Sequence, residues 1–217
     1  MVRSRTLLKD RAYLELKELI QSGEFAANGF LSERQLSERL GMSKTPIRAA
    51  LEHLEAQGLV SVSPQQGIYV RELSVGEIRD LFDMRSALEP HVAASLARQE
   101  SLTDLSRLRA NLAAQLEAAR KSDAVAATRL DIELHLQLAE LCGNVEIVTW
   151  LVRCFDKLHR SILQVNRLSA GRLEVGTREH QKIVDLIVAH QADDAAEAMR
   201  RHLAYGRQFL LNGSAVS

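Results

Sequence analysis

Polar side chains interrupt the apolar stripes of three predicted helices in the second half of the chain. Asp131 and His135 are four residues apart, so they share one helical face, and leucines occupy the rest of that face. His180 and His202 lie on the apolar stripes of the last two helices. Burying a neutral polar group without a partner costs roughly 2–7 kcal/mol, and burying a charge costs more. We therefore expect these four side chains to contact one another or an ion, and one divalent metal would satisfy all of them.

Two other interpretations of the histidines stay open at this point. Each histidine by itself is more typical of a hydrogen-bonded core residue, and only the joint pattern favours a metal site. Three imidazoles and a carboxylate suit Zn, Ni, Mn, Co or Fe, and the affinity order does not choose among them. Zinc held in this way can also activate water, which is the chemistry of a metallohydrolase. Four protein ligands leave less open coordination, however, and no separate general base stands out nearby, so we predict that the chain is not an enzyme.

A charged residue occupies the stripe of an earlier helix. Arg85 follows Ile78 by seven residues, which places its guanidinium on the buried face. A buried cation needs an anionic partner. One candidate is a small organic acid that binds the guanidinium and the metal together. The alternative is a protein carboxylate, with Asp131, Glu133 and Glu89 as candidates.

These helices follow a segment, residues 31–70, that predicts two short helices joined by a tight corner. Ser32 and Gln35 form a capping box, which starts the first helix. Gly41 ends it, because glycine adopts the left-handed conformation at little cost. Ser43 is predicted to cap the second helix, which carries a proline in its first turn, where no intrahelical hydrogen bond is lost.

A predicted hairpin completes a winged helix-turn-helix. Residues 59–63 and 68–71 read as strands, and residues 64–67 read as the turn between them. The second helix presents polar residues at its N-terminal end, where the helix dipole favours a phosphate: Ser43, Lys44, Thr45 and Arg48. Arg48 can also pair with the two acceptors of guanine in the major groove. The alternative is that these are ordinary solvated residues of a small helical domain.

Beyond residue 72 the pattern is helical throughout, with six predicted amphipathic helices that can bury their stripes only by bundling. The predicted fold is therefore mainly α, with a winged helix-turn-helix domain at 5–72 and an all-helical six-helix domain at 73–217. The chain carries no net charge, with 28 basic and 28 acidic residues, so local placement must provide any DNA binding. No apolar run approaches the ~20 residues of a membrane span, and the chain begins in an amphipathic helix, which predicts a cytoplasmic protein without membrane contact.

The first domain resembles bacterial transcription regulators of the GntR family. The matching residues are Leu31 to Leu40, Gly41 to Arg48, Ala50, Leu51, Leu54, Gly58 to Val60, Pro64 and Gly67. The resemblance implies DNA contacts at the following positions: Arg34, Lys44, Thr45, Arg48 and Gly67. Lys44 replaces a more usual arginine, and two glutamines at the wing tip replace basic residues, so the operator sequence does not follow.

The second domain resembles the FCD domain, of the VanR-type subgroup, that follows the DNA-binding domain in one branch of the GntR family. The resemblance rests on Asp131-x-x-x-His135, His180 and His202, and on Arg85 with Glu89. It implies a metal held by one aspartate and three histidines. Leu134 stands where phenylalanine is usual, which removes no ligand.

The combined resemblance implies a metabolite-responsive regulator, and repression is the usual outcome in the family. Such regulators bind as homodimers to near-palindromic operators in double-stranded DNA, because two recognition helices must meet two half-sites. The predicted effector is a small carboxylate metabolite, bound through Arg85. The alternative is a regulator whose metal is purely structural and which responds to no small molecule.

Overall fold

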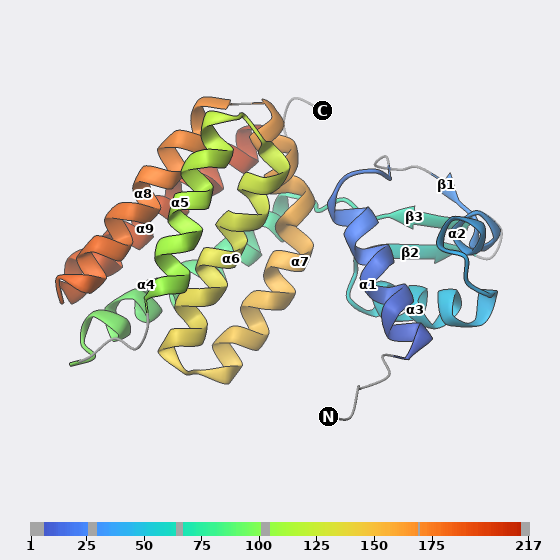
Figure 1. Cartoon of the computed structure of the whole chain (residues 1–217), viewed down its shortest axis with the longest axis horizontal. Coiled ribbons are helices and arrows are strands. Elements are labelled where there is room, and N and C mark those ends of the chain that lie inside the picture. The colour runs from blue at the N-terminus through green and yellow to red at the C-terminus, as the bar shows by residue number, and fades with distance from the viewer. Residues whose placement is uncertain (1–6, 26–29, 64–66, 101–104, 169, 214–217) are drawn as a thin grey trace. The chain divides into compact units, whose positions relative to one another are not determined.

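The computed structural model describes residues 7–25, 30–63, 67–100, 105–168 and 170–213, and these contain nine helices and three strands. They form two compact units, Met1–Glu72 and Leu73–Ser217 (Figure 1). The predicted fold class is confirmed: the chain is mainly α, and a small three-stranded sheet is confined to the first unit.

The first unit is a winged helix-turn-helix. Its elements are α1 (Leu8–Gln21), β1 (Phe30–Leu31), α2 (Glu33–Leu40), α3 (Lys44–Ala56), β2 (Val60–Ser63) and β3 (Gly67–Val70). The strands are antiparallel in the order β1-β3-β2, and Val62 is paired with Ile68. The sequence did not predict β1, because two residues carry no detectable alternation of side chains. Of the predicted turn at residues 64–67, residues 64–66 lie outside the described residues, and Gly67 begins β3.

The two helices of the helix-turn-helix begin differently. The Ser32 hydroxyl accepts a hydrogen bond from the backbone N–H of Gln35 at 3.2 Å. The side-chain oxygen of Gln35 accepts from the backbone N–H of Ser32 at 3.0 Å, so the predicted capping box is present. Gly41 ends α2 at φ +62° in the left-handed region, as predicted. Ser43 occupies the N-cap position of α3, but its side chain makes no capping hydrogen bond. The predicted position of the cap is therefore confirmed, but the side chain of Ser43 does not supply the capping hydrogen bond.

The second unit is a bundle of six helices within the described residues. They are α4 (Val75–Ala97), α5 (Ser106–Arg120), α6 (Ala124–Cys142), α7 (Val145–Leu168), α8 (Ala170–Val188) and α9 (Ala192–Gly213). Helix α4 packs against α9, α5 packs against α6 and α8, and α6 packs against α7. Figure 1 shows α5, α6 and α7 running alongside one another.

An apolar core from all six helices surrounds the polar residues of this unit. Leu134, Leu138 and Leu151 are buried with almost no exposed surface, and Ile183 and Leu203 contribute from α8 and α9. A second capping box, Ser74 with Glu77, starts α4. Among the described helices, none combines the length and the apolar character that crossing a membrane requires.

Candidate metal centre

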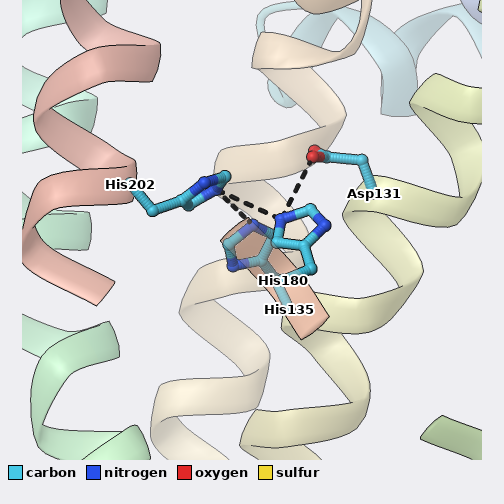
Figure 2. A group of neighbouring side chains, drawn as sticks. All are labelled: Asp131, His135, His180 and His202. Atoms are coloured by element: carbon cyan, nitrogen blue, oxygen red, sulfur yellow. Dashed lines mark hydrogen bonds and ion pairs between the residues drawn. The ribbon is translucent and has the colours of Figure 1, made fainter. Parts of the chain in front are cut away.

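Three imidazoles and one carboxylate converge inside the helical unit (Figure 2). Asp131 and His135 extend from α6, while His180 extends from α8 and His202 from α9. The Nε2 atom of His202 lies 3.3 Å from His135 Nε2 and 3.2 Å from His180 Nε2, and Asp131 Oδ1 lies 3.5 Å from His180 Nε2. One donor atom from each of the four residues lies within 4.8 Å of all the others. The structure thus brings together all four residues that the sequence selected.

The spacing of the donor atoms fits a shared transition-metal ion. Two nitrogens bound to one ion at ~2.0–2.1 Å and the tetrahedral angle lie about 3.3–3.4 Å apart. The two measured separations between imidazole nitrogens, 3.2 and 3.3 Å, are close to that value. The three histidines are almost completely buried, whereas Asp131 is about a quarter exposed. The donor set therefore suits an ion that is reached from one side.

Each imidazole is held through its other nitrogen by a side chain outside the cluster. His180 Nδ1 lies 2.8 Å from Gln115 Oε1. His202 Nδ1 lies 2.7 Å from Glu179 Oε2, and His135 Nδ1 contacts a carboxylate oxygen of Glu89. A neutral imidazole that donates from Nδ1 keeps its lone pair on Nε2. These contacts therefore select the tautomer that presents Nε2 to a metal, which is the usual arrangement around protein metal ions.

Burial keeps the two C-terminal imidazoles neutral. Loss of solvent, together with the neighbouring His202 and His135, holds the pKa of His180 well below its ordinary value. Burial also lowers the pKa of His202, although the hydrogen bond to Glu179 opposes this shift. Neutral imidazoles are the form that binds metals, so the site needs no deprotonation of these groups at neutral pH.

Arg85 resolves one of the alternatives left open by the sequence. Its Nε lies 2.5 Å from Glu89 Oε1, and both side chains are almost completely buried. Burial opposes the charges of this pair, but their mutual attraction outweighs it: the pKa of Arg85 is raised and the pKa of Glu89 is lowered to about 2. The guanidinium carbon lies over the rings of Phe82 and Phe155, 4.9 and 4.5 Å from their centroids. The protein partner is thus Glu89, among the three candidates.

Arg85 also borders the position where a ligand of the metal would bind. Its Nη2 lies 3.5 Å from His135 Nε2, and its side chain lines a cavity of about 70 Å³ together with Asp131, His180 and His202. That volume is smaller than the ~150 Å³ cavity known to take up benzene. The cavity therefore suits a molecule of a few heavy atoms.

Three residues that support the site were not selected from the sequence as site residues. Gln115 and Glu179 hold two of the imidazoles, and Arg172 lies in the cavity wall with its Nη atoms 3.1 Å from Glu179 Oε2. A signal existed for Gln115: it follows Asn111 by four residues on an apolar helix face, and both are buried. No comparable periodic signal distinguishes Arg172 from Arg178, the other arginine of α8.

The predicted DNA-contacting residues lie on the surface of the first unit. Arg34 is exposed on α2, and an exposed group at or near the start of α3 consists of Ser43, Lys44, Thr45 and Arg48. Gly67 begins β3 and is half-buried. The early amides of α3 have no intrahelical acceptor, by helix geometry, so they remain suitable for a phosphate.

Arg48 has a protein partner that the sequence did not indicate. Its Nε lies 2.9 Å from both carboxylate oxygens of Glu33 in the first turn of α2. The hydrogen bond and the charge of Glu33 raise the pKa of the guanidinium. The contact occupies the Nε side of the guanidinium, while its two Nη groups remain for another acceptor.

The winged helix-turn-helix fold, with Lys44 and Arg48 exposed in the first turns of α3, defines the class of protein: a DNA-binding regulator of the winged helix-turn-helix type. The profile of the GntR family of bacterial regulatory proteins matches residues 8–70, and that of the FCD domain matches residues 80–205. The chain therefore belongs to the GntR family of bacterial transcription regulators, in the branch with a C-terminal FCD domain. It is a regulator and not an enzyme, as the sequence predicted.

Individual relatives agree with this assignment over nearly the whole chain. The HTH-type transcriptional repressor GlaR of Escherichia coli is 30% identical, covering 88% of this chain and 90% of GlaR. The repressor NanR of an Enterobacter species is 28% identical, with 92% and 84% covered. A GntR regulator structure from Rhodococcus sp. RHA1 superposes with a TM-score of 0.82 at 22% identity, covering 94% of this chain and 97% of that one, which supports the fold.

Proposed function

We propose that this regulator binds a divalent metal through Asp131, His135, His180 and His202, and that a small organic acid binding beside the metal alters its affinity for operator DNA. The observation that carries the proposal is the convergence of three Nε2 atoms and one carboxylate in a buried site. Zn, Ni, Mn, Co and Fe all suit this donor set. When bound, the ion would supply a Lewis-acidic position for a carboxylate oxygen.

The proposed effector binds where the metal and Arg85 meet. Arg85 lines the cavity, and its Nη2 lies beside a metal-binding nitrogen. One carboxylate can therefore contact both, with the guanidinium fixing its orientation. An effector shifts DNA binding only if it binds the two states of the protein with different affinity.

DNA binding is assigned to α3 and its surroundings. Arg48 is proposed to contact a base edge, whereas Ser43, Lys44 and Thr45 contact phosphates at the helix N-terminus. Arg34 on α2 and Gly67 at the wing complete the proposed interface. The proposed target is a near-palindromic operator in the cytoplasm, bound by a homodimer that represses transcription. The two relatives described above are both named repressors.

The experiment compares one purified protein in three states. Metal content is measured by elemental analysis, and binding to DNA from the region upstream of its own gene is measured for protein that is metal-loaded, chelated, or metal-loaded with candidate carboxylates. We expect one metal per chain and a change in operator affinity with at least one acid. Sedimentation at the same protein concentration tests the dimer. Folded protein that holds no stoichiometric metal would contradict the proposal.

The second candidate function is a regulator whose metal is only structural. It is favoured by the position of the cluster between α6, α8 and α9, where an ion would tie three helices together. In that case chelation unfolds the helical domain, and no acid changes operator binding except by removing metal. Circular dichroism of the chelated protein separates the two candidates.

A further inference from the structure

A second guanidinium faces the cavity from α8. Arg172 is the other arginine among the described residues that line the cavity, and its side chain is only 10% exposed. Both Nη atoms lie 3.1 Å from the same oxygen of Glu179, and the guanidinium carbon lies 4.5 Å from the ring centroid of Tyr205. Arg172 is therefore fixed in place before any ligand binds.

The contacts of Arg172 lead directly to the proposed metal centre. Glu179 Oε2, which accepts from Arg172, also accepts from His202 Nδ1 at 2.7 Å. One imidazole ring and one carboxylate oxygen thus separate the guanidinium from a metal-binding nitrogen. A small molecule bound at the metal can extend toward Arg172 within one cavity.

Arg172 retains hydrogen-bond donors for a ligand. A guanidinium has five N–H groups, and the contacts with Glu179 use two of them. Gly176, one turn further along α8, also lines the cavity, and a Cβ atom there would lie 3.6 Å from Arg172 Nη1. Since glycine places no side chain there, the space beside the guanidinium stays open.

The charges around the cavity indicate how many negative charges a ligand should carry. Glu89 balances Arg85, and Glu179 balances Arg172. A divalent ion brings two positive charges, and Asp131 balances one of them. One positive charge therefore remains, and it is located at the metal. One carboxylate neutralises it.

We propose that Arg172 recognises a neutral oxygen at the far end of the effector, so that the effector is a small monocarboxylate with a hydroxyl or carbonyl group and not a dicarboxylate. This inference rests on the proposed effector site. A second carboxylate would bring an unbalanced negative charge and would compete with Glu179 for Arg172. A simple alkanoate would leave the remaining donors of Arg172 without a partner.

The test uses three acids that differ only at one end: propanoate, 3-hydroxypropanoate and malonate, with the four-carbon series butanoate, 4-hydroxybutanoate and succinate beside it. Each is titrated calorimetrically into zinc-loaded full-length protein, and the zinc content is measured again afterwards. We expect at least one hydroxy acid to bind about tenfold or more tightly than its alkanoate, since its oxygen bonds to a charged donor. We expect both dicarboxylates to bind more weakly than their alkanoates.

The variant that isolates Arg172 keeps the charge count unchanged. Arg172→Gln combined with Glu179→Gln removes one charge of each sign, and the new amide oxygen at position 179 can still accept from His202. We expect this variant to lose the preference for the hydroxy acid, which is measured as the ratio of hydroxy-acid affinity to alkanoate affinity in the same variant. Arg178→Gln is the control, because Arg178 is on the same helix but is exposed and paired with Glu174. Circular dichroism and zinc content confirm that each variant is folded and loaded.

The outcomes separate this inference from the proposed function. If a dicarboxylate binds most tightly, or if the hydroxy-acid preference survives in the double variant, the assignment of Arg172 is wrong while the effector site stands. If no acid binds zinc-loaded protein, both the effector site and the role of Arg172 are wrong.

Discussion

Gln115 provides a sharp test of how the proposed metal site is held, because it contacts the site without being one of the four proposed ligands. Its Oε1 lies 2.8 Å from His180 Nδ1, and its Nε2 lies 2.7 Å from Asn111 Oδ1 and 3.3 Å from the carbonyl of Leu130. The change Gln115→Leu keeps a similar side-chain volume but removes the acceptor of His180. The imidazole is then free to adopt the other tautomer or to rotate.

The size of the effect follows from these contacts. Loss of the partner that orients a metal-binding imidazole lowers metal affinity about 10–100-fold, or about 1.4–2.8 kcal/mol of binding free energy. The metal-free protein loses the hydrogen bond to Asn111, and leaving that buried amide oxygen without a donor costs about 1–3 kcal/mol of the free energy of unfolding. The two effects are separable, since only the first involves zinc.

Zinc affinity is measured by competition with a chromophoric chelator, and stability is measured by urea unfolding of the metal-free protein. The matched control is Gln137→Leu, another buried glutamine, which lies on α6 and donates to Glu133 at 3.0 Å. We expect the control to bind zinc as the unmodified protein does. Unchanged zinc affinity in Gln115→Leu, or an equal loss in both variants, would refute the reasoning.

Three other predictions concern DNA binding and stability. Arg48→Ala should weaken specific operator binding by about 1–3 kcal/mol and relax discrimination at one base pair. Arg34→Ala should weaken binding to all DNA sequences alike and reduce the slope of log affinity against log salt concentration by about one, as fluorescence anisotropy at several salt concentrations will show. If Arg48→Ala weakens binding to specific and random DNA equally, Arg48 is not the base reader. Glu33→Gln should raise the affinity for random DNA, because it removes a negative charge beside the proposed phosphate contacts. It should also lower the ratio of specific to random binding, because Arg48 loses the partner that orients it. An unchanged ratio would contradict a role of Glu33 in positioning Arg48. Leu54→Ala removes a fully buried side chain and should cost about 2–5 kcal/mol in the urea unfolding of the first unit, against less than about 0.5 kcal/mol for the exposed Leu14→Ala.

Local chemistry made most of the architecture predictable. The Ser32–Gln35 box and Gly41 act through neighbours a few residues apart, so their effect can be read without the fold. The same holds for the apolar periodicity that predicted six helices after the wing. The short β1 strand was missed because it forms only through pairing with β3, a segment almost forty residues away.

The sequence also determined which side chains form the proposed metal centre, because histidines and an aspartate on apolar stripes must share a buried space. It did not determine how they are held. Gln115, Glu89 and Glu179 come from α5, α4 and α8, and each reaches a histidine on a different helix. The two residues of each such pair are 23 to 65 positions apart in the chain and meet only because the helices pack together. No periodic pattern in the sequence indicates these pairs.

The choice of partner for each cation was likewise decided only in three dimensions. Several carboxylates were chemically suitable for Arg85, and packing selected Glu89 one turn away on the same helix. Packing also placed Glu33 against Arg48 and Glu179 against Arg172. Two charges interact strongly only when they are close in space. Residue types therefore show that a buried charge needs a partner, but only the tertiary structure shows which residue that partner is.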